Sequence, residues 1–217
     1  MARQYGDACG ISRALNLVGD RWSLLVVREL LYGQKRFTDL RSALAGVSPN
    51  VLTQRLGELV DRGIVQRRRP TPFAAIEIYG LTEVGQKLEA VLLALGHWGS
   101  RVAPPSPGSQ LSTESLLLAM KSTRRPGSRA PSGEYELDID GDMVTAAVSD
   151  DELKFRRGPS SEPVGRISAG GGTLRAVIFA DRTVAGALRS RDLRFTGDSA
   201  ALTAYLSMFE RPQLFGT

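Results

Sequence analysis

The sequence predicts a mainly α-helical first half followed by an α+β second half, and three observations support this division. Residues 102–110 contain three prolines and a glycine, which disfavour both helix and sheet and predict a linker. Before this stretch apolar residues recur at helical spacing, and after it several short segments alternate as strands do. The charge changes at the same place: residues 1–101 hold 14 lysines and arginines against 9 acidic residues, whereas residues 102–217 hold 14 of each. We therefore expect a domain over residues 1–102, a linker over 103–113 and a second domain over 114–217.

Single copies of cysteine and histidine exclude several classes of protein. Cys9 cannot form a disulfide within the chain, and Cys9 with His97 cannot complete a zinc site. A catalytic triad would need His97, which lies in an apolar helical stretch and is expected to pack or to meet a partner. No apolar run approaches the ~20 residues of a membrane span, and the N-terminus has no signal core. We expect a cytoplasmic protein that is not an enzyme, holds no metal or cofactor and binds no membrane.

Helical spacing and capping residues predict the elements of the first half in order. Apolar residues of segment 11–18 share one helix face, and segment 22–31 is apolar nearly all round, which predicts a central helix. Thr38 is a suitable N-cap for a short helix that follows. Ser48 and Pro49 open the next helix, because serine caps a helix and proline fits its first position.

The helix after Ser48 combines a leucine stripe with an opposite polar face. Short strands over residues 64–69 and 75–79 follow, the first ending in three arginines, and a last helix starts at Thr82. This order predicts a winged helix-turn-helix, which places one helix in the major groove of DNA. Asparagine and glutamine on this helix can pair with adenine, and arginine can pair with guanine. The hairpin arginines and nearby basic side chains such as Lys35 and Arg41 can contact DNA phosphates. The residues expected at DNA are Arg36, Ser48, Asn50, Val51, Thr53, Gln54, Arg55, Arg67, Arg68 and Arg69.

Five collinear segments resemble the HxlR-type winged-helix regulators of bacteria. They are residues 9–15, 19–22, 36–40, 46–56 and 79–85. The resemblance implies a homodimeric regulator of transcription that binds double-stranded DNA at a palindromic operator. It also implies that residues 48–61 are the recognition helix and that the hairpin of residues 64–79 is the wing.

The last helix of the first half supports a dimer independently. Five apolar residues repeat at intervals of 4, 3, 4 and 3, a heptad-like seam suited to helix pairing. The alternative is an ordinary amphipathic helix that faces its own core. We place Ile11, Val84, Leu88, Val91, Leu95 and Trp98 at the dimer interface. Two subunits joined in this way would hold their recognition helices about one DNA turn, ~34 Å, apart.

The second half predicts a small antiparallel sheet packed on helices. The expected strands are 134–140, 143–148, 153–156, 164–168 and 193–195, and the expected helices are 115–122, 174–178, 184–190 and 200–210. The segment Arg191–Asp198 and the helix ending at Phe209 resemble the sterol-carrier-protein-type lipid-binding fold. The resemblance implies that an apolar small molecule or lipid binds between sheet and helices, at Leu117, Met120, Val177, Phe195, Leu206 and Phe209. The alternative is that these side chains are simply packed core.

Two further hypotheses remain open. Cys9 aligns with a cysteine that senses oxidants or electrophiles in related regulators, although Gly10 follows it where those regulators often have proline. Its position just before a helix, with Arg13 one turn on, suits a reactive thiolate; the alternative is an inert residue. The chain could also be a lipid or metabolite carrier whose winged helix binds another protein.

Overall fold

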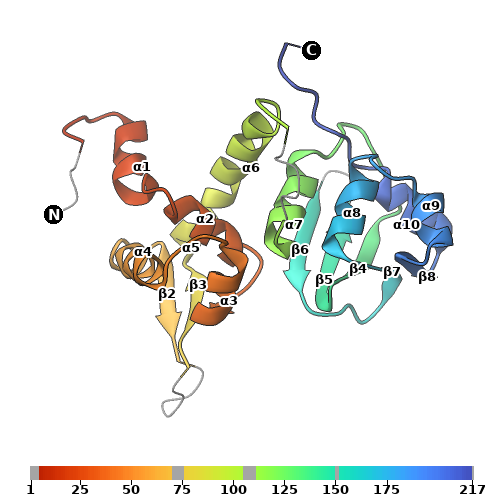
Figure 1. Cartoon of the computed structure of the whole chain (residues 1–217), viewed down its shortest axis with the longest axis horizontal. Coiled ribbons are helices and arrows are strands. Elements are labelled where there is room, and N and C mark those ends of the chain that lie inside the picture. Colours follow the sequence, from red (N-terminus) through yellow and green to blue (C-terminus); the bar gives the residue numbers. More distant parts are fainter. Residues whose placement is uncertain (1–4, 70–75, 105–110, 150–151, 217) are drawn as a thin grey trace. The chain divides into compact units, whose positions relative to one another are not determined.

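The computed structural model describes residues 5–69, 76–104, 111–149 and 152–216, and it divides the chain into two compact units (Figure 1). The units are Met1–Leu92 and Leu93–Thr217, so their boundary falls inside helix α6 (Leu88–Gly99). The sequence placed the boundary at residue 102 instead. Most of the expected linker, residues 105–110, lies outside the described residues.

The first unit contains helices around a small antiparallel sheet of order β1-β3-β2. Its helices are α1 (Gly10–Val18), α2 (Ser23–Leu30), α3 (Phe37–Ala43), α4 (Pro49–Asp61) and α5 (Glu83–Gln86), and its strands are β1 (Lys35–Arg36), β2 (Val65–Arg68) and β3 (Ile78–Leu81). This is a winged helix-turn-helix in which α3 and α4 precede the β2–β3 hairpin. Residues 70–75 of that hairpin lie outside the described residues.

Local capping explains where these helices begin. The Ser48 hydroxyl accepts a hydrogen bond from the Val51 amide at 3.3 Å, as expected of an N-cap before Pro49. The expectation that Thr38 caps α3 is wrong, because the helix begins one residue before it, at Phe37. Asp39 closes that turn instead, since its carboxylate accepts from the Arg36 amide at 3.2 Å.

The second unit is built on a five-stranded sheet of order β6-β5-β4-β7-β8. Its strands are β4 (Gly133–Ile139), β5 (Asp142–Val148), β6 (Leu153–Arg157), β7 (Pro163–Ala169) and β8 (Leu193–Gly197), and its helices are α7 (Thr113–Ser122), α8 (Gly171–Ile178), α9 (Val184–Arg189) and α10 (Ser199–Leu206). The strands and helices fall close to the segments that the sequence predicts, but α10 is shorter. It ends at Leu206 because the chain then pairs Phe209 with Arg124 as an isolated bridge.

The expectation of an antiparallel sheet is wrong for one pair of strands, because β4 and β7 run parallel. Residues 158–162 carry the chain from β6, at one edge, to the far side of β4. The Ser160 amide donates to Glu136 of β4 at 2.9 Å, and the Thr145 hydroxyl of β5 donates to the Gly158 carbonyl at 2.7 Å. These bonds anchor the crossing segment to the polar face of the sheet, which alternation along each strand could not reveal.

The two faces of this sheet differ in character. On the apolar face Tyr135 of β4 stacks on Tyr205 of α10 with ring centroids 4.9 Å apart, and Tyr205 meets Phe209 edge to face at 5.5 Å. On the polar face Glu136, only 1% exposed, accepts a hydrogen bond from Arg166 at 2.6 Å. Burial by itself raises the pKa of Glu136, but the hydrogen bonds from Arg166 and the Ser160 amide outweigh it and lower the pKa below its ordinary value.

The end of α6 is tied to the C-terminal residues of the chain. The Arg101 guanidinium lies over the Phe215 ring, 4.5 Å from its centroid, and donates to the Gln213 carbonyl at 3.1 Å. The Phe215 amide donates to the Arg101 carbonyl at 2.8 Å. His97 hydrogen-bonds through Nδ1 to the Ser122 carbonyl at 3.2 Å. These contacts explain why the last turns of α6 group with the second unit.

Candidate nucleic-acid interface

Helix α4 presents a polar face whose opposite side is fixed in the core. Leu52, Leu56 and Leu59 are at most 1% exposed and anchor the helix, which contacts α2 and β2. On the outer side Asn50, Thr53 and Gln54 are exposed, whereas Val51 is half-buried. A helix held in this way can offer its first two turns to a DNA groove without losing its packing.

Two of the exposed side chains already have hydrogen-bond partners within the helix. The Thr53 hydroxyl donates to the Pro49 carbonyl at 2.9 Å, and the Gln54 amide donates to Glu58 at 2.9 Å. To pair with an adenine, as the sequence predicts, Gln54 would have to exchange its bond to Glu58 for a bond to the base.

Arg55 has a different environment from the one that a base-reading arginine needs. Its side chain is only 13% exposed and forms ion pairs with Asp20 and, at 2.6 Å, with Glu58. Arg62 joins the cluster, 3.6 Å from Asp20 and 3.7 Å from Glu58, and donates to the Leu17 carbonyl at 2.7 Å. The cluster ties α4 to the end of α1. This cluster was not predicted from the sequence, although the i, i+3 and i, i+4 spacing of Arg55, Glu58 and Arg62 is a recognisable signal of such ion pairs.

A second cluster of ion pairs includes Lys35, one of the basic side chains expected to contact a DNA phosphate. Glu29 of α2 is fully buried, and it pairs with Arg28 at 2.8 Å and with Lys35 of β1 at 3.1 Å. Lys35 therefore supplies the counter-charge that a buried carboxylate requires. Arg36 and Arg41, on either side of the start of α3, are exposed.

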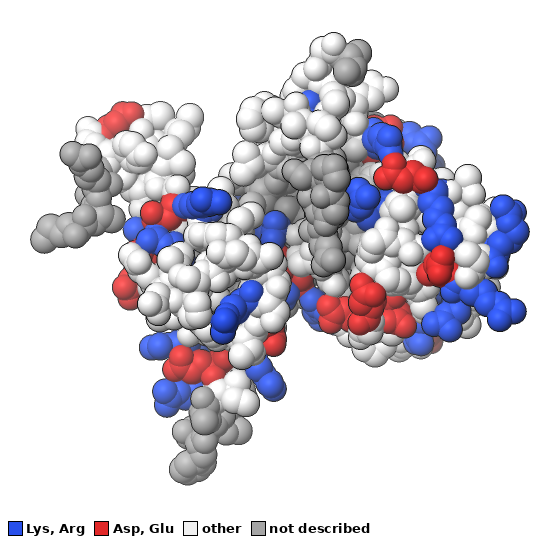
Figure 2. All heavy atoms as spheres, in the orientation of Figure 1, with Lys and Arg blue, Asp and Glu red and all other residues white. Residues whose placement is uncertain are grey.

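The hairpin after α4 carries three exposed cations of the predicted interface. Arg67 and Arg69 are 56% and 61% exposed, and both lie near Glu77, at 3.5 and 3.3 Å. Arg68 donates to the Gln66 side chain at 3.1 Å. Figure 2 shows basic and acidic side chains close together around the β2–β3 hairpin. Burial, together with the nearby Glu77 carboxylate, raises the pKa of Tyr79 on the neighbouring strand.

The apolar seam predicted on one helix after Thr82 is divided between two helices, α5 and α6, and most of it faces solvent in the single chain. Val91, Leu95 and Trp98 are 49%, 46% and 57% exposed, Val84 just before them is 59% exposed, and Leu88 is half-buried. Ile11 on α1 is 71% exposed. A helix facing its own core would bury such side chains, so this surface has the character of an interaction site.

The remaining predicted sites lie elsewhere. Cys9 is exposed immediately before α1, where its amide donates to the Asp7 carboxylate at 2.9 Å. This bond, with a second from Ser12, lowers the pKa of Asp7.

The residues expected to bind an apolar ligand are buried except Phe195, which is half-buried: Leu117, Met120, Val177, Phe195, Leu206 and Phe209. None of the described helices is long and apolar enough to cross a bilayer.

Comparison with known proteins identifies the first half of the chain. A family model described as HxlR-like helix-turn-helix matches residues 17–107. The chain is 38% identical over 97 residues to an HTH-type transcriptional regulator of Synechocystis, covering 45% of this chain and 72% of that one. It is 38% identical over 106 residues to one of Mycobacterium tuberculosis, covering 49% and 65%. It is 34% identical over 92 residues to the HTH-type transcriptional regulator YodB of Bacillus subtilis, covering 42% and 82%.

A solved structure is similar over the same region. The redox regulator HypR in its oxidized form is 29% identical, with a TM-score of 0.42, and the match covers 45% of this chain and all of that one. The curated relatives are described as transcriptional regulators and not as enzymes. The chain belongs to the HxlR-like helix-turn-helix family.

Proposed function

We propose that the protein is a homodimeric regulator of transcription that binds a palindromic operator through α4 and the β2–β3 hairpin. The observation that carries the proposal is the exposed polar face of α4, with Asn50, Thr53 and Gln54 beside a buried leucine stripe. Asn50 and Gln54 are suited to adenine, and the hairpin arginines to phosphates. Arg55 positions α4 through Asp20 and Glu58 instead of reading a base.

The exposed seam on α6 supports the dimer. Leu95 and Trp98 leave a large apolar area in water, and a second copy of the same helix is the partner that an isologous interface supplies. Two recognition helices separated by about one DNA turn, ~34 Å, would then match the half-sites of a palindrome.

Fluorescence anisotropy with DNA from upstream of the protein's own gene tests this function. Gln54→Ala is expected to weaken binding to the preferred sequence by about 1–3 kcal/mol while leaving binding to random duplex unchanged. Gln86→Ala is the matched control, because Gln86 is an exposed glutamine on α5, outside the proposed interface. A Gln54→Ala variant that discriminates between the two duplexes as well as the parent does would refute the role of α4.

We further propose that the second unit responds to an apolar molecule held at its aromatic core. The supporting observation is Tyr205, which is fully buried and whose hydroxyl has no hydrogen-bond partner among the described residues. A bound molecule or water would satisfy that hydroxyl. Organic extraction and mass spectrometry of natively purified protein should recover a lipid-like compound. Recovery of such a compound without any DNA binding would favour the carrier function instead.

A redox role for Cys9 is the remaining proposal. Its exposure at the start of α1 makes the thiol accessible to an oxidant. Cys9→Ser should remove any loss of DNA binding that mild peroxide causes. If the Cys9→Ser variant responds to peroxide as the parent does, this role is refuted.

A further inference from the structure

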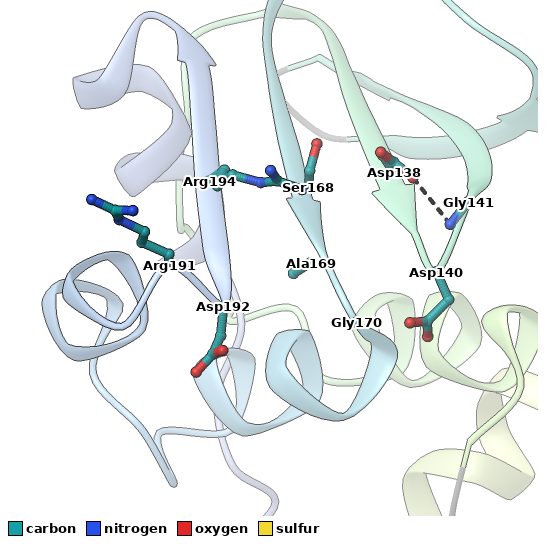
Figure 3. Close-up of a pocket in the computed structure, with 9 residues that line it drawn as sticks. All are labelled: Asp138, Asp140, Gly141, Ser168, Ala169, Gly170, Arg191, Asp192 and Arg194. Atoms are coloured by element: carbon teal, nitrogen blue, oxygen red, sulfur yellow. Dashed lines mark hydrogen bonds between the residues drawn. The ribbon is translucent and has the colours of Figure 1, made fainter.

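The second unit has a cavity of about 200 Å³ where the parallel strands β4 and β7 end (Figure 3). Its walls come from the turn after β4, from the end of β7 with the start of α8, and from the α9–β8 connection. The carboxyl ends of parallel strands form a crevice where α/β proteins commonly bind ligands. All residues that line this cavity belong to the second unit, and none of them is among the residues expected to bind DNA or an apolar ligand.

Three polar side chains form a row across the sheet at this cavity. Asp138 on β4 is the register partner of Ser168 on β7, which is the register partner of Arg194 on β8. Directly opposed residues leave the same face, and neighbouring strands lie about 4.8 Å apart. The Cα atoms of Asp138 and Arg194 are therefore two strand spacings apart, about 10 Å, and Ser168 lies on the strand between them. Figure 3 shows the three side chains in this order.

Two other carboxylates of the cavity, Asp140 and Asp192, form hydrogen bonds within the protein. Asp140 accepts from the Gly171 amide at 2.8 Å, and Asp192 pairs with Arg182 at 2.7 Å. Hydrogen bonds from Arg182 and Ser190 lower the pKa of Asp192. Figure 3 shows Arg191 directed away from the row. Asp140 and Asp192 are thus held in the cavity lining by bonds to the start of α8 and to Arg182, outside the row of Asp138, Ser168 and Arg194.

The three side chains of the row, Asp138, Ser168 and Arg194, have polar atoms that form no hydrogen bond among the described residues. Asp138 uses Oδ1 to accept from the Gly141 amide at 3.1 Å. Within the described residues no hydrogen bond reaches Asp138 Oδ2, Ser168 Oγ or the Arg194 guanidinium. A carboxylate oxygen accepts, a guanidinium donates through five N–H groups, and a hydroxyl does both. The row therefore offers an acceptor at one end and donors at the other.

We propose that this row binds a small zwitterion of the amino-acid class. Its ammonium group lies on Asp138 Oδ2, its carboxylate pairs with the Arg194 guanidinium, and Ser168 Oγ hydrogen-bonds between them. A simple anion would satisfy Arg194 and face the Asp138 carboxylate, and a simple cation would do the reverse. A molecule carrying both charges is complementary to both ends of the row.

Calorimetric titration of the full chain with matched probes tests the charge requirement. The zwitterions are glycine, 3-aminopropanoate and 4-aminobutanoate, which differ in spacer length, and the half-probes are butanoate and butylamine. At least one zwitterion is expected to bind tenfold or more tightly than either half-probe. Equal binding of butanoate would show a plain anion site, and failure of all three zwitterions at millimolar concentration would refute the proposal.

Two variants test the residues, each with a control of the same chemistry. Asp138→Asn and Arg194→Gln should each weaken zwitterion binding at least tenfold. Glu162→Gln and Arg189→Gln, which change exposed charges outside the cavity lining, should leave it unchanged. Circular dichroism and the melting temperature check that each variant folds. DNA binding by Asp138→Asn without zwitterion should equal that of the parent, so loss of this site is distinguishable from failure of the regulatory function.

Discussion

Replacing Arg67, Arg68 and Arg69 together by alanine should lower both DNA affinity and its dependence on salt. Each phosphate contact contributes about −0.9 to the slope of log K against log salt, so three contacts contribute about −2.7. Between 50 and 200 mM salt the parent should therefore lose about 40-fold more affinity than the triple variant does. The exposure of Arg67 and Arg69 makes both available to phosphates once they leave Glu77.

Anisotropy titrations at four or more salt concentrations measure this slope directly. Arg129→Ala with Arg189→Ala serves as the control, because both are exposed arginines of the second unit. The control variant should keep the slope of the parent. A triple variant with the slope of the parent would refute the assignment of the hairpin as the wing.

Replacing Glu77, on the same hairpin, should change DNA affinity in the opposite direction. Its carboxylate lies within 3.5 Å of both Arg67 and Arg69 and competes with phosphates for them. Glu77→Gln should therefore raise DNA affinity at low salt and steepen the slope. Weaker binding by Glu77→Gln would mean that Glu77 orders the arginines for DNA and does not compete with it.

Three other changes test the cap of α4, the polar face of the sheet and the α6 seam. Ser48→Ala removes the acceptor of the Val51 amide and should cost about 1 kcal/mol of unfolding free energy in urea titrations, whereas an unchanged midpoint would contradict the cap. Glu136→Gln replaces a carboxylate held by Arg166 and should cost about 1–3 kcal/mol at pH 7. Because the folded pKa of Glu136 lies below its ordinary value of 4.5, this stabilisation is present above about pH 4.5 and is lost as the pH falls through the folded pKa. The difference between parent and Glu136→Gln should therefore shrink at pH 3, and a constant difference would contradict the ion pair. Leu95→Glu should shift sedimentation equilibrium toward monomer while circular dichroism shows the helical content of the parent, and a stable dimer would contradict the seam.

Features fixed by neighbouring residues could be predicted from the sequence. The start of α4 depends on Ser48 and Pro49, and the start of α5 depends on Thr82, whose hydroxyl accepts from the Gly85 amide at 3.1 Å. The common face of Leu88, Val91, Leu95 and Trp98 follows from spacing within one helix, α6, although the single helix predicted after Thr82 is in fact divided at Lys87 into α5 and α6. In each case the determining contacts span at most a few turns, so the pattern in the sequence carries the information.

Features that depend on distant partners could not be predicted in the same way. The direction of β7 is set by the crossing segment that Glu136 and Thr145 anchor, and strand alternation is the same for either direction. Arg55 is of a residue type that commonly contacts guanine, but its side chain pairs with Asp20, which lies outside α4. Lys35 likewise looks like a phosphate contact but neutralises buried Glu29. Charge and spacing do not show which side chain is already paired.

Helix α6 also constrains how this protein can be divided or recombined. Because the helix begins in one unit and ends in the other, the DNA-binding unit does not end at the proline-rich segment predicted as the linker. A fragment ending there would lose the Phe215 and Ser122 contacts that hold the last turns of the helix. In a chimera that joins this DNA-binding unit to a foreign sensor domain, the sensor domain would have to supply residues that pack against the last turns of α6.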